Sequence, residues 1–162
     1  MNLHEALKVF KITKDFSDSI KQRYRALIKK YHPDLNPGID SKFFHLVTEA
    51  NDLLRKEWHK IATIEIVICR NEGRKTFRFK FISGWNITLG RADSSDISIN
   101  DMYISRNHLN IELLERKVRI IDTGKNQSKT LSSALKRPYE DFWLPLRLMI
   151  SKEIGIKIQK EN

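Results

Sequence analysis

The sequence predicts a multi-domain α and β fold, in which a small all-helical domain is followed by an all-β domain of the sandwich or barrel type. Up to about residue 58, apolar side chains recur at intervals of three and four, as on one face of a helix. Beyond residue 63, they alternate with polar residues at intervals of two, as in strands. The change of period places the boundary between Trp58 and Ile64 and predicts domains over residues 1–60 and 63–162.

Three helices are expected in the first domain. The most regular covers residues 20–31, with Ile20, Tyr24, Leu27 and Tyr31 on one apolar face, and it ends before a proline, which cannot continue the hydrogen bonding of a helix. A short helix is expected over residues 3–9 and a longer one over 41–58, with Ser41 as its N-cap. Residues 13–19 are expected to form the turn between the first two helices.

Many short strands are expected in the second domain, because apolar and polar residues alternate in eight separate runs. These runs lie at residues 64–69, 77–81, 87–89, 97–99, 109–114, 118–121, 146–150 and 156–158. The side chains of Phe77, Phe79 and Phe81 are expected to belong to the core. Cys69 is the only cysteine, so no intramolecular disulfide can form, and we expect a buried strand residue in a reducing compartment.

Composition points to a soluble protein with an acidic partner. The chain has 30 Lys and Arg against 20 Asp and Glu, and the excess is spread over both halves. No signal-peptide core and no run of transmembrane length is present, so a cytoplasmic location and no membrane association are expected. No Walker-type glycine loop, metal-ligand cluster or nucleophile with a base is evident, which predicts a non-enzyme without metal or cofactor. The oligomeric state is left open.

A basic helix followed by a short turn is the most informative feature of the first domain. Lys21, Arg25 and Lys29 recur at intervals of four along the second helix, opposite its apolar face. The tripeptide His32-Pro33-Asp34 follows directly, before the third helix. Taken alone, the basic strip could be an ordinary solvated face. With the tripeptide between two helices of the right phase, residues 1–58 resemble the J domain.

That resemblance implies a role in chaperone binding. In J domains the tripeptide and the basic face of the second helix dock on a DnaK-type heat-shock chaperone and stimulate its ATP hydrolysis. Asp34 can then pair with an arginine of the partner, and Pro33 and His32 hold the turn. Lys21, Arg25 and Lys29 would speed association. The chain departs from the family's usual pattern at Leu3-His4, Lys8 and Leu35, which leaves the identity of the chaperone open.

The second domain carries three ordered motifs: Leu89-Gly90-Arg91, the run from Asp96 to Ile99, and the segment from Ile104 to His108. On these motifs, residues 63–162 closely resemble the forkhead-associated (FHA) domain, an eleven-stranded β-sandwich. The resemblance implies that Arg91, Ser105, Arg106 and Asn126 contact a phosphothreonine peptide, because guanidinium, hydroxyl and amide groups donate hydrogen bonds to phosphate. It implies a structural role for His108, which braces the loops.

One loop departs from this pattern. The FHA family favours Asn-Gly-Thr where this chain has Asn126-Gln127-Ser128 after Lys125, and glycine at that place suits a left-handed backbone. A sandwich that has lost phosphate binding and recognises partners independently of phosphate is therefore an alternative. A nucleic-acid-binding protein is another, disfavoured because exposed aromatic residues among the basic ones are not evident. The leading interpretation is a co-chaperone adaptor for phosphothreonine-containing proteins.

Overall fold

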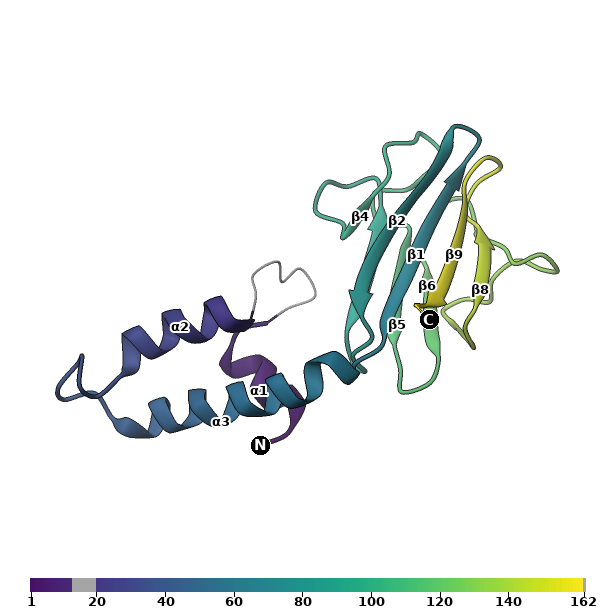
Figure 1. Cartoon of the computed structure of the whole chain (residues 1–162). Coiled ribbons are helices and arrows are strands. Elements are labelled where there is room, and N and C mark those ends of the chain that lie inside the picture. The colour runs from purple at the N-terminus through teal and green to yellow at the C-terminus, as the bar shows by residue number, and fades with distance from the viewer. Residues whose placement is uncertain (13–19, 162) are drawn as a thin grey trace. The chain divides into compact units, whose positions relative to one another are not determined.

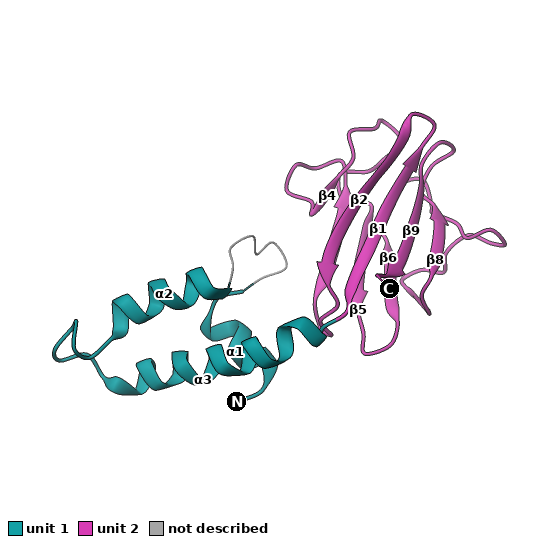
Figure 2. Ribbon diagram, viewed as in Figure 1, with its two compact units in different colours: residues 1–61 teal, residues 62–162 magenta. Residues whose placement is uncertain are grey.

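The computed structural model describes residues 1–12 and 20–161 and divides into two compact units, Met1–Ile61 and Ala62–Asn162 (Figure 2). The turn expected over residues 13–19 lies outside the described residues. None of the helices in the described ranges is long and apolar enough to span a bilayer.

Unit 1 is helical. Helix α1 covers Leu3–Val9, α2 covers Ile20–Tyr31 and α3 covers Ser41–Glu57, and a short 3₁₀ helix follows at Trp58–Lys60. Helices α2 and α3 form a hairpin, and α1 packs against α3 (Figure 1). The buried side chains come from α1, from the segment that follows it and from α3: Ala6, Leu7, Phe10, Ile12, Val47, Ala50 and Leu54.

Two details of unit 1 differ from the sequence-based expectation. The N-cap of α3 is Asp40, whose carboxylate accepts a hydrogen bond from the Lys42 N–H at 2.9 Å, so the prediction of Ser41 was wrong. A carboxylate at this place also interacts favourably with the helix dipole. Helix α2 buries no residue completely, because it packs on a single neighbouring helix and leaves its apolar face, such as Leu27 and Tyr31, half-buried.

Unit 2 is a sandwich of two sheets. The strands are β1 Thr63–Arg70, β2 Gly73–Lys80, β3 Asn86–Gly90, β4 Ile97–Ser98, β5 Leu109–Leu113, β6 Val118–Asp122, β7 Glu140–Phe142, β8 Leu146–Met149 and β9 Gly155–Lys160. One sheet has the order β2-β1-β9-β8 and the other the order β4-β3-β5-β6-β7, and only β3 and β4 pair in parallel. The core between the sheets is rich in isoleucine, including Ile64, Ile66, Ile111, Ile120 and Ile158.

The structure confirms all eight predicted strand runs and adds β7, so the part of the chain that it describes has nine strands rather than eleven. Lys129 belongs to none of these strands and forms isolated β-bridges with Ala134 and Met149. Phe77 and Phe79 of β2, and Phe81 after it, pack against this core as expected but remain half-buried, since β2 is an edge strand. Cys69 is also half-buried, because it alternates with Ile68 and lies on the outer face of β1.

Strand register gathers three loops at one end of the sandwich. Leu89 of β3 pairs with Leu109 of β5, and Leu109 pairs with Asp122 of β6, with both pairs antiparallel. The C-terminal ends of β3 and β6 therefore lie beside the N-terminal end of β5. The segments 91–96, 99–108 and 123–139 consequently begin or end at this edge, and they include all four residues expected to bind phosphate.

Candidate functional site

The His32-Pro33-Asp34 turn is held by the histidine itself. The Asp34 N–H donates to His32 Nδ1 at 3.1 Å, so in the neutral ring the proton lies on Nε2. The His32 ring packs edge-on against Phe44 of α3, with centroids 5.1 Å apart. The carboxylate of Asp34 lies 3.8 Å from His32 Nδ1 and is otherwise open to solvent, with its side chain 85% exposed. The turn therefore presents an acid to solvent on a braced backbone.

Asn36 closes the end of α2 beside this turn. Its Nδ2 lies 3.2 Å from the Lys29 carbonyl oxygen and 3.4 Å from that of His32, so it satisfies carbonyls that have no partner within the helix. The Asn36 N–H also donates to the His32 carbonyl oxygen at 3.0 Å. Sequence reasoning did not single out Asn36, because it lies five residues beyond the last residue of α2, outside the positions at which a helix cap is usually sought.

The basic strip of α2 lies where the sequence predicted it. Lys21, Arg25 and Lys29 are exposed, and among the residues that the structure describes they make no ion pair. Residues four apart on a helix stand about 6 Å apart along its axis, so the three cations form a continuous ridge. This ridge leads toward the turn that carries Asp34.

In unit 2, the loops of Arg91 and Arg106 are joined by their backbones. The Arg91 N–H donates to the Ser105 carbonyl oxygen at 2.9 Å, and the Ala92 N–H donates to that of Arg106 at 3.1 Å. The guanidinium groups of Arg91 and Arg106 remain exposed, and neither is paired with an acid in the described part of the chain. Two unpaired arginines thus extend from adjacent loop segments.

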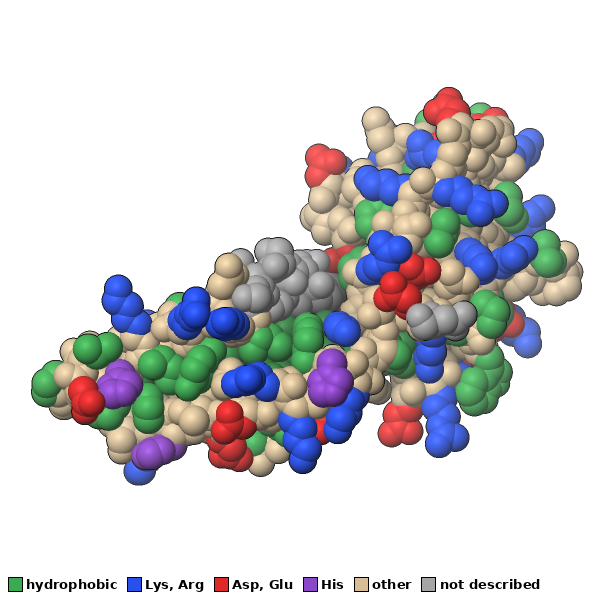
Figure 3. All heavy atoms as spheres, viewed as in Figure 1, with side chains coloured by type: hydrophobic (Ala, Val, Ile, Leu, Met, Phe, Trp, Pro, Cys, Tyr) green, Lys and Arg blue, Asp and Glu red, His purple; other side chains and the backbone are tan. Residues whose placement is uncertain are grey.

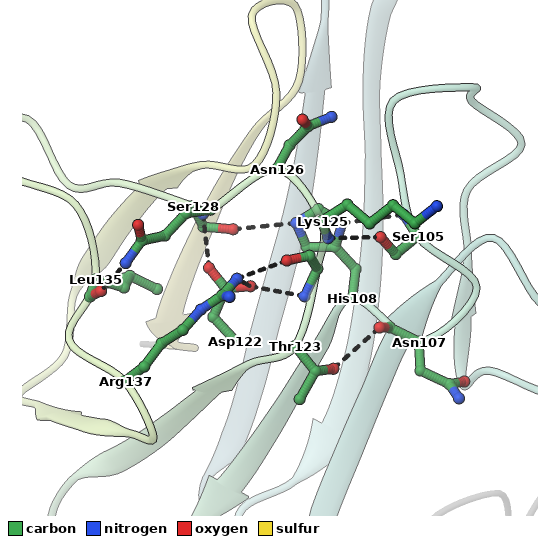
Figure 4. Close-up of polar contacts among 12 residues, drawn as sticks. Ser105, Asn107, His108, Asp122, Thr123, Lys125, Asn126, Ser128, Leu135 and Arg137 are labelled. Atoms are coloured by element: carbon green, nitrogen blue, oxygen red, sulfur yellow. Dashed lines mark hydrogen bonds and ion pairs between the residues drawn. The ribbon is translucent and has the colours of Figure 1, made fainter.

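The third loop is attached to the same place. The Lys125 N–H donates to Ser105 Oγ at 2.9 Å, and Asn126 Nδ2 donates to the Tyr103 carbonyl oxygen at 3.1 Å. The Ser105 hydroxyl accepts one hydrogen bond and keeps its own proton for another acceptor. Figure 4 shows the Lys125 side chain extending beside Ser105 and the Asn126 amide pointing away from the buried network. The structure therefore brings together the loops of Arg91, Ser105, Arg106 and Asn126.

A buried histidine supports these loops from the interior of the domain. His108 is completely buried, its Nδ1 accepts from the Ser105 N–H at 3.1 Å, and its Nε2 lies 3.3 Å from Ser128 Oγ (Figure 4). Since Nδ1 is an acceptor, the neutral ring carries its proton on Nε2 and donates to Ser128. Burial lowers the pKa of His108 below its usual range, although the carboxylate of Asp122 opposes the shift. The expected bracing role of His108 is confirmed.

Asp122 fixes the loop that carries Asn126. Its Oδ2 accepts from the Ser128 N–H at 2.6 Å and its Oδ1 accepts from the Gly124 N–H at 3.0 Å. Its carboxylate is buried, and Arg137 supplies the compensating charge at 3.4 Å. A Cβ on Gly124 would lie 2.5 Å from the His108 ring, so this glycine is required for the close approach.

The departure at Gln127 does not strain the loop. Lys11 is the one non-glycine residue with positive φ in the described ranges, so Gln127 does not adopt the left-handed backbone expected to require glycine, and that expectation was wrong. The Gln127 amide instead donates to the Leu135 carbonyl oxygen. Gln127 stands where the FHA family favours glycine, and its side chain joins two parts of the 123–139 segment.

Lys125 and Gly90 were not among the predicted site residues. Lys125 adds a third exposed cation beside Ser105. Gly90 faces the Arg106 carbonyl so closely that no side chain fits. The charge of Lys125 was visible in the sequence, whereas the contact of Gly90 depends on a long-range pairing. The described ranges hold no group of His, Cys, Asp and Glu able to bind a metal ion.

Comparisons with known proteins agree with this geometry. Residues 2–62 match the DnaJ domain family and residues 87–139 match the FHA domain family. The chain is 48% identical over 61 residues to the chaperone protein DnaJ of Staphylococcus aureus, and 54% identical over 50 residues to that of Lactiplantibacillus plantarum. These matches cover 36% and 29% of this chain, but 16% and 13% of the two relatives.

Solved FHA structures share the fold of unit 2. The FHA domain of the CT664 protein from Chlamydia trachomatis has a TM-score of 0.54 and 17% identity, covering 62% of this chain and 99% of that one. An FHA domain from Arabidopsis thaliana has a TM-score of 0.53 and 22% identity, covering 63% and 87%. The yeast Dun1 FHA domain, determined with a doubly phosphorylated peptide, has a TM-score of 0.52 and 16% identity, covering 62% and 75%.

Motif, fold and family matches coincide in each unit. The helical unit carries the His32-Pro33-Asp34 turn within the segment that matches the DnaJ family. The sandwich carries Arg91, Ser105 and Arg106 on converging loops within the segment that matches the FHA family. The chain therefore joins a DnaJ domain, also called a J domain, to an FHA domain.

Proposed function

We propose that this protein is a non-enzymatic co-chaperone adaptor, with a J domain over residues 1–60 and an FHA domain over residues 63–162. The J domain engages a DnaK-type chaperone and stimulates its ATPase. The FHA domain binds phosphothreonine-containing proteins and brings them to the chaperone. The protein acts in the cytoplasm, without a metal or cofactor.

The chaperone-binding half of the proposal is supported by the exposure of Asp34. An acid on a short, braced turn can form a charge-assisted hydrogen bond with an arginine of the partner at little cost in ordering. The ridge of Lys21, Arg25 and Lys29 adds an electrostatic field that favours an acidic surface and raises the association rate.

The observation that carries the phosphothreonine half is the backbone pairing of Arg91 with Ser105. It joins the backbone segments that carry Arg91, Ser105 and Arg106. Both arginines lack an acid partner among the described residues, and Ser105 keeps a hydroxyl proton to donate. Asn126 completes the set through the loop held by Asp122. Donors of this kind on rigid loops suit a phosphate dianion.

The chaperone-binding half is tested by ATPase measurements with a DnaK-type protein from the same organism. His32→Gln and Asp34→Asn should each abolish stimulation while leaving the helical content unchanged, because both residues lie at the end of α2 and neither is in its core. His45→Gln, an exposed change on α3, is the matched control and should retain full stimulation. Full stimulation by the Asp34→Asn protein would refute this half.

The phosphothreonine half is tested with a phosphothreonine peptide array on the intact chain, followed by titration of the best peptide and its unphosphorylated twin. Arg91→Ala should remove the preference for the phosphorylated form, and Arg116→Ala should keep it. Equal binding of both forms by the parent protein would favour the alternative of a phosphate-independent FHA domain.

Nucleic acid is a second candidate partner because of one surface feature. Trp143 and Tyr139 are 61% and 48% exposed, contrary to the expectation that exposed aromatic residues are lacking, and each ring has a cation above it. Arg119, above Tyr139, is however already hydrogen-bonded to Asp141 at 2.8 Å. We rank this candidate second. The chain would then bind arbitrary single-stranded DNA with a steep salt dependence, and Trp143→Ala would lose this binding. Such a result would favour nucleic acid as the partner.

A further inference from the structure

The outer face of the sheet β2-β1-β9-β8 carries a cluster of cations, and Glu65 on the same face attracts one of them, Lys157. Arg147 of β8 and Lys157 of β9 are direct cross-strand partners. Like charges in this arrangement destabilise a sheet. Neither side chain makes an ion pair with any residue that the structure describes. Arg74 on β2 adds a third unpaired cation to the same face.

Between these cations lies a hollow of about 390 Å³. It is lined by the apolar side chains of Val67, Cys69, Leu131 and Met149, and by Gly155. Gly155 pairs with Cys69 on one side and Met149 on the other. Because Gly155 has no side chain, this cross-strand row of three residues has a gap in its middle. Leu131, on the loop that follows β6, is 91% exposed.

This face lies at a different place from the loop tips of Arg91 and Ser105, because it is the side of the sheet that points away from the core. Figure 3 shows it turned toward the viewer, with blue Lys and Arg side chains spread over β1, β2 and β9 and green ones between them. Glu65, an acid on this face, is already hydrogen-bonded to Arg78 and Gln159. Arg74 and Arg147 therefore remain available, whereas the charge of Lys157 is partly compensated by Glu65.

We propose that this face is a second docking site, which binds an unphosphorylated acidic segment of a protein partner in extended form. Arg74 and Arg147 lie on strands three positions apart, about 14 Å at the usual strand spacing, and the register offsets them by two residues, about 7 Å, along the strands, so they stand roughly 16 Å apart. In an extended peptide, side chains at positions i and i+4 point the same way and are about 13–14 Å apart, a difference that the long arginine side chains can bridge.

The segment that fits has Asp or Glu at positions i and i+4 and an apolar residue at i+2. The acids face Arg74 and Arg147, and the apolar side chain enters the hollow above Gly155. Lys157 provides a further positive charge beside that side chain. Aromatic residues, on which nucleic-acid bases stack, do not occur among the residues that line the hollow, so the chemistry favours a peptide over single-stranded nucleic acid.

The test uses the intact chain and a short fluorescein-labelled peptide with the central sequence Glu-Ser-Leu-Ser-Glu, followed by fluorescence anisotropy. Binding should be saturable and weaken with salt, as expected for charged groups at the rim of an interface. Replacing both glutamates by glutamine, or the leucine by serine, should each weaken binding by roughly fivefold or more. Equal affinity for either altered peptide would overturn the proposal.

Protein variants separate this site from a general effect of charge. Arg147→Glu should weaken peptide binding by roughly fivefold or more, whereas Arg116→Glu, an exposed change of equal charge in the turn between β5 and β6, should have less than about a twofold effect. Because Arg147→Glu replaces a like-charge pair with an opposite-charge pair, its melting temperature should be unchanged or higher. A similar loss in both variants would refute a defined site.

Gly155→Val provides an independent test that does not alter charge. A Cβ at residue 155 would lie 3.3 Å from Met149 Sδ, at the flexible end of a side chain, so the sheet should tolerate the change while the hollow fills. Binding of the leucine-containing peptide should then fall to that of the serine-containing one. Unchanged binding would overturn the assignment of the apolar residue to the hollow.

The inference is independent of phosphothreonine recognition. Arg91→Ala should leave the affinity for this unphosphorylated peptide unchanged, and Arg147→Glu should leave phosphopeptide binding unchanged. Displacement of the labelled peptide by a lower concentration of single-stranded DNA than of unlabelled peptide would assign the face to nucleic acid and refute the proposal.

Discussion

A Cβ atom on Gly90 would lie 2.0 Å from the carbonyl oxygen of Arg106. Neither backbone can move without breaking the pairing of Arg91 with Ser105, so Gly90→Ala should separate the two loops. We expect a loss of about 1–3 kcal/mol in the free energy of unfolding, from overpacking, together with loss of phosphopeptide binding. Urea unfolding and peptide titration measure both effects. Ser94→Ala, an exposed change in the same loop, should alter neither.

The lowered pKa of His108 predicts that acid destabilises the FHA domain. Because burial lowers this pKa from its ordinary value of 6.5, protons bind the unfolded chain more readily than the folded one. The contribution of His108 to stability is thus complete above about pH 6.5 and declines as the pH falls from there through the folded pKa, by at most about 1.4 kcal/mol per pH unit.

Urea unfolding at several pH values, followed through the NMR signals of β5 and β6, measures this dependence. His108→Gln should be less stable at neutral pH but show a flatter pH profile below it, since the titrating ring is gone. His45→Gln, in the other domain, should keep the slope. An unchanged slope in His108→Gln would show that another group causes the acid sensitivity.

Asn36 should be a positioning residue for chaperone coupling. Asn36→Asp has nearly the same shape but cannot donate to the carbonyls of Lys29 and His32, and it adds a negative charge at the C-terminal end of a helix. We expect a loss of about 0.5–1.5 kcal/mol in the stability of α2 and a raised half-maximal concentration for ATPase stimulation. The maximal stimulation should be preserved, unlike in Asp34→Asn. A loss of maximal stimulation would place Asn36 in the contact itself.

Lys125 should increase affinity for phosphate without creating selectivity. Its exposed side chain can contribute up to about 1 kcal/mol to an ion pair, so Lys125→Ala should weaken phosphopeptide binding by up to roughly fivefold at low salt. The preference over the unphosphorylated twin should persist, because Arg91 and Arg106 remain. Titrations at low and high salt check this, and the difference between the proteins should shrink as salt rises.

The N-cap of α3 provides a direct comparison of two neighbouring residues. Asp40→Ala should destabilise the J domain by about 0.5–2 kcal/mol because the hydrogen bond to the Lys42 N–H is lost. Ser41→Ala should have little effect, since its side chain caps nothing. Urea unfolding followed by circular dichroism distinguishes the two, and the reverse order would restore the original assignment to Ser41.

Local patterns allowed much of the architecture to be predicted. The three helices and eight of the nine strands in the described ranges follow from periods of 3.6 and two, and Pro33 correctly marked the end of α2. Strand β7 was missed because Glu140-Asp141-Phe142 is too short for alternation to show. Its place is set by pairing with β6, a tertiary effect that no local pattern carries.

Burial was less predictable than secondary structure. The alternation of Phe77 and Phe79 identifies a strand but not its position at the edge of a sheet, where each ring stays partly accessible. Cys69 is similar, since the alternation does not say which of the two sets of side chains faces the core when both contain apolar residues. At the candidate site, Arg91 and Ser105 were visible as motif residues, whereas the contacts of Gly90 and Arg137 depend on long-range pairing.

The hydrogen bonds among the three loops of the FHA domain have a kinetic and thermodynamic consequence. Since the loops of Arg91, Ser105 and Asn126 are already joined to one another, a phosphopeptide that binds there as proposed would meet a preorganised site. Little conformational entropy is then lost on association, and recognition can proceed as rigid docking instead of coupled folding. Such a surface discriminates mainly through dissociation rates, so partners should differ in residence time more than in speed of capture.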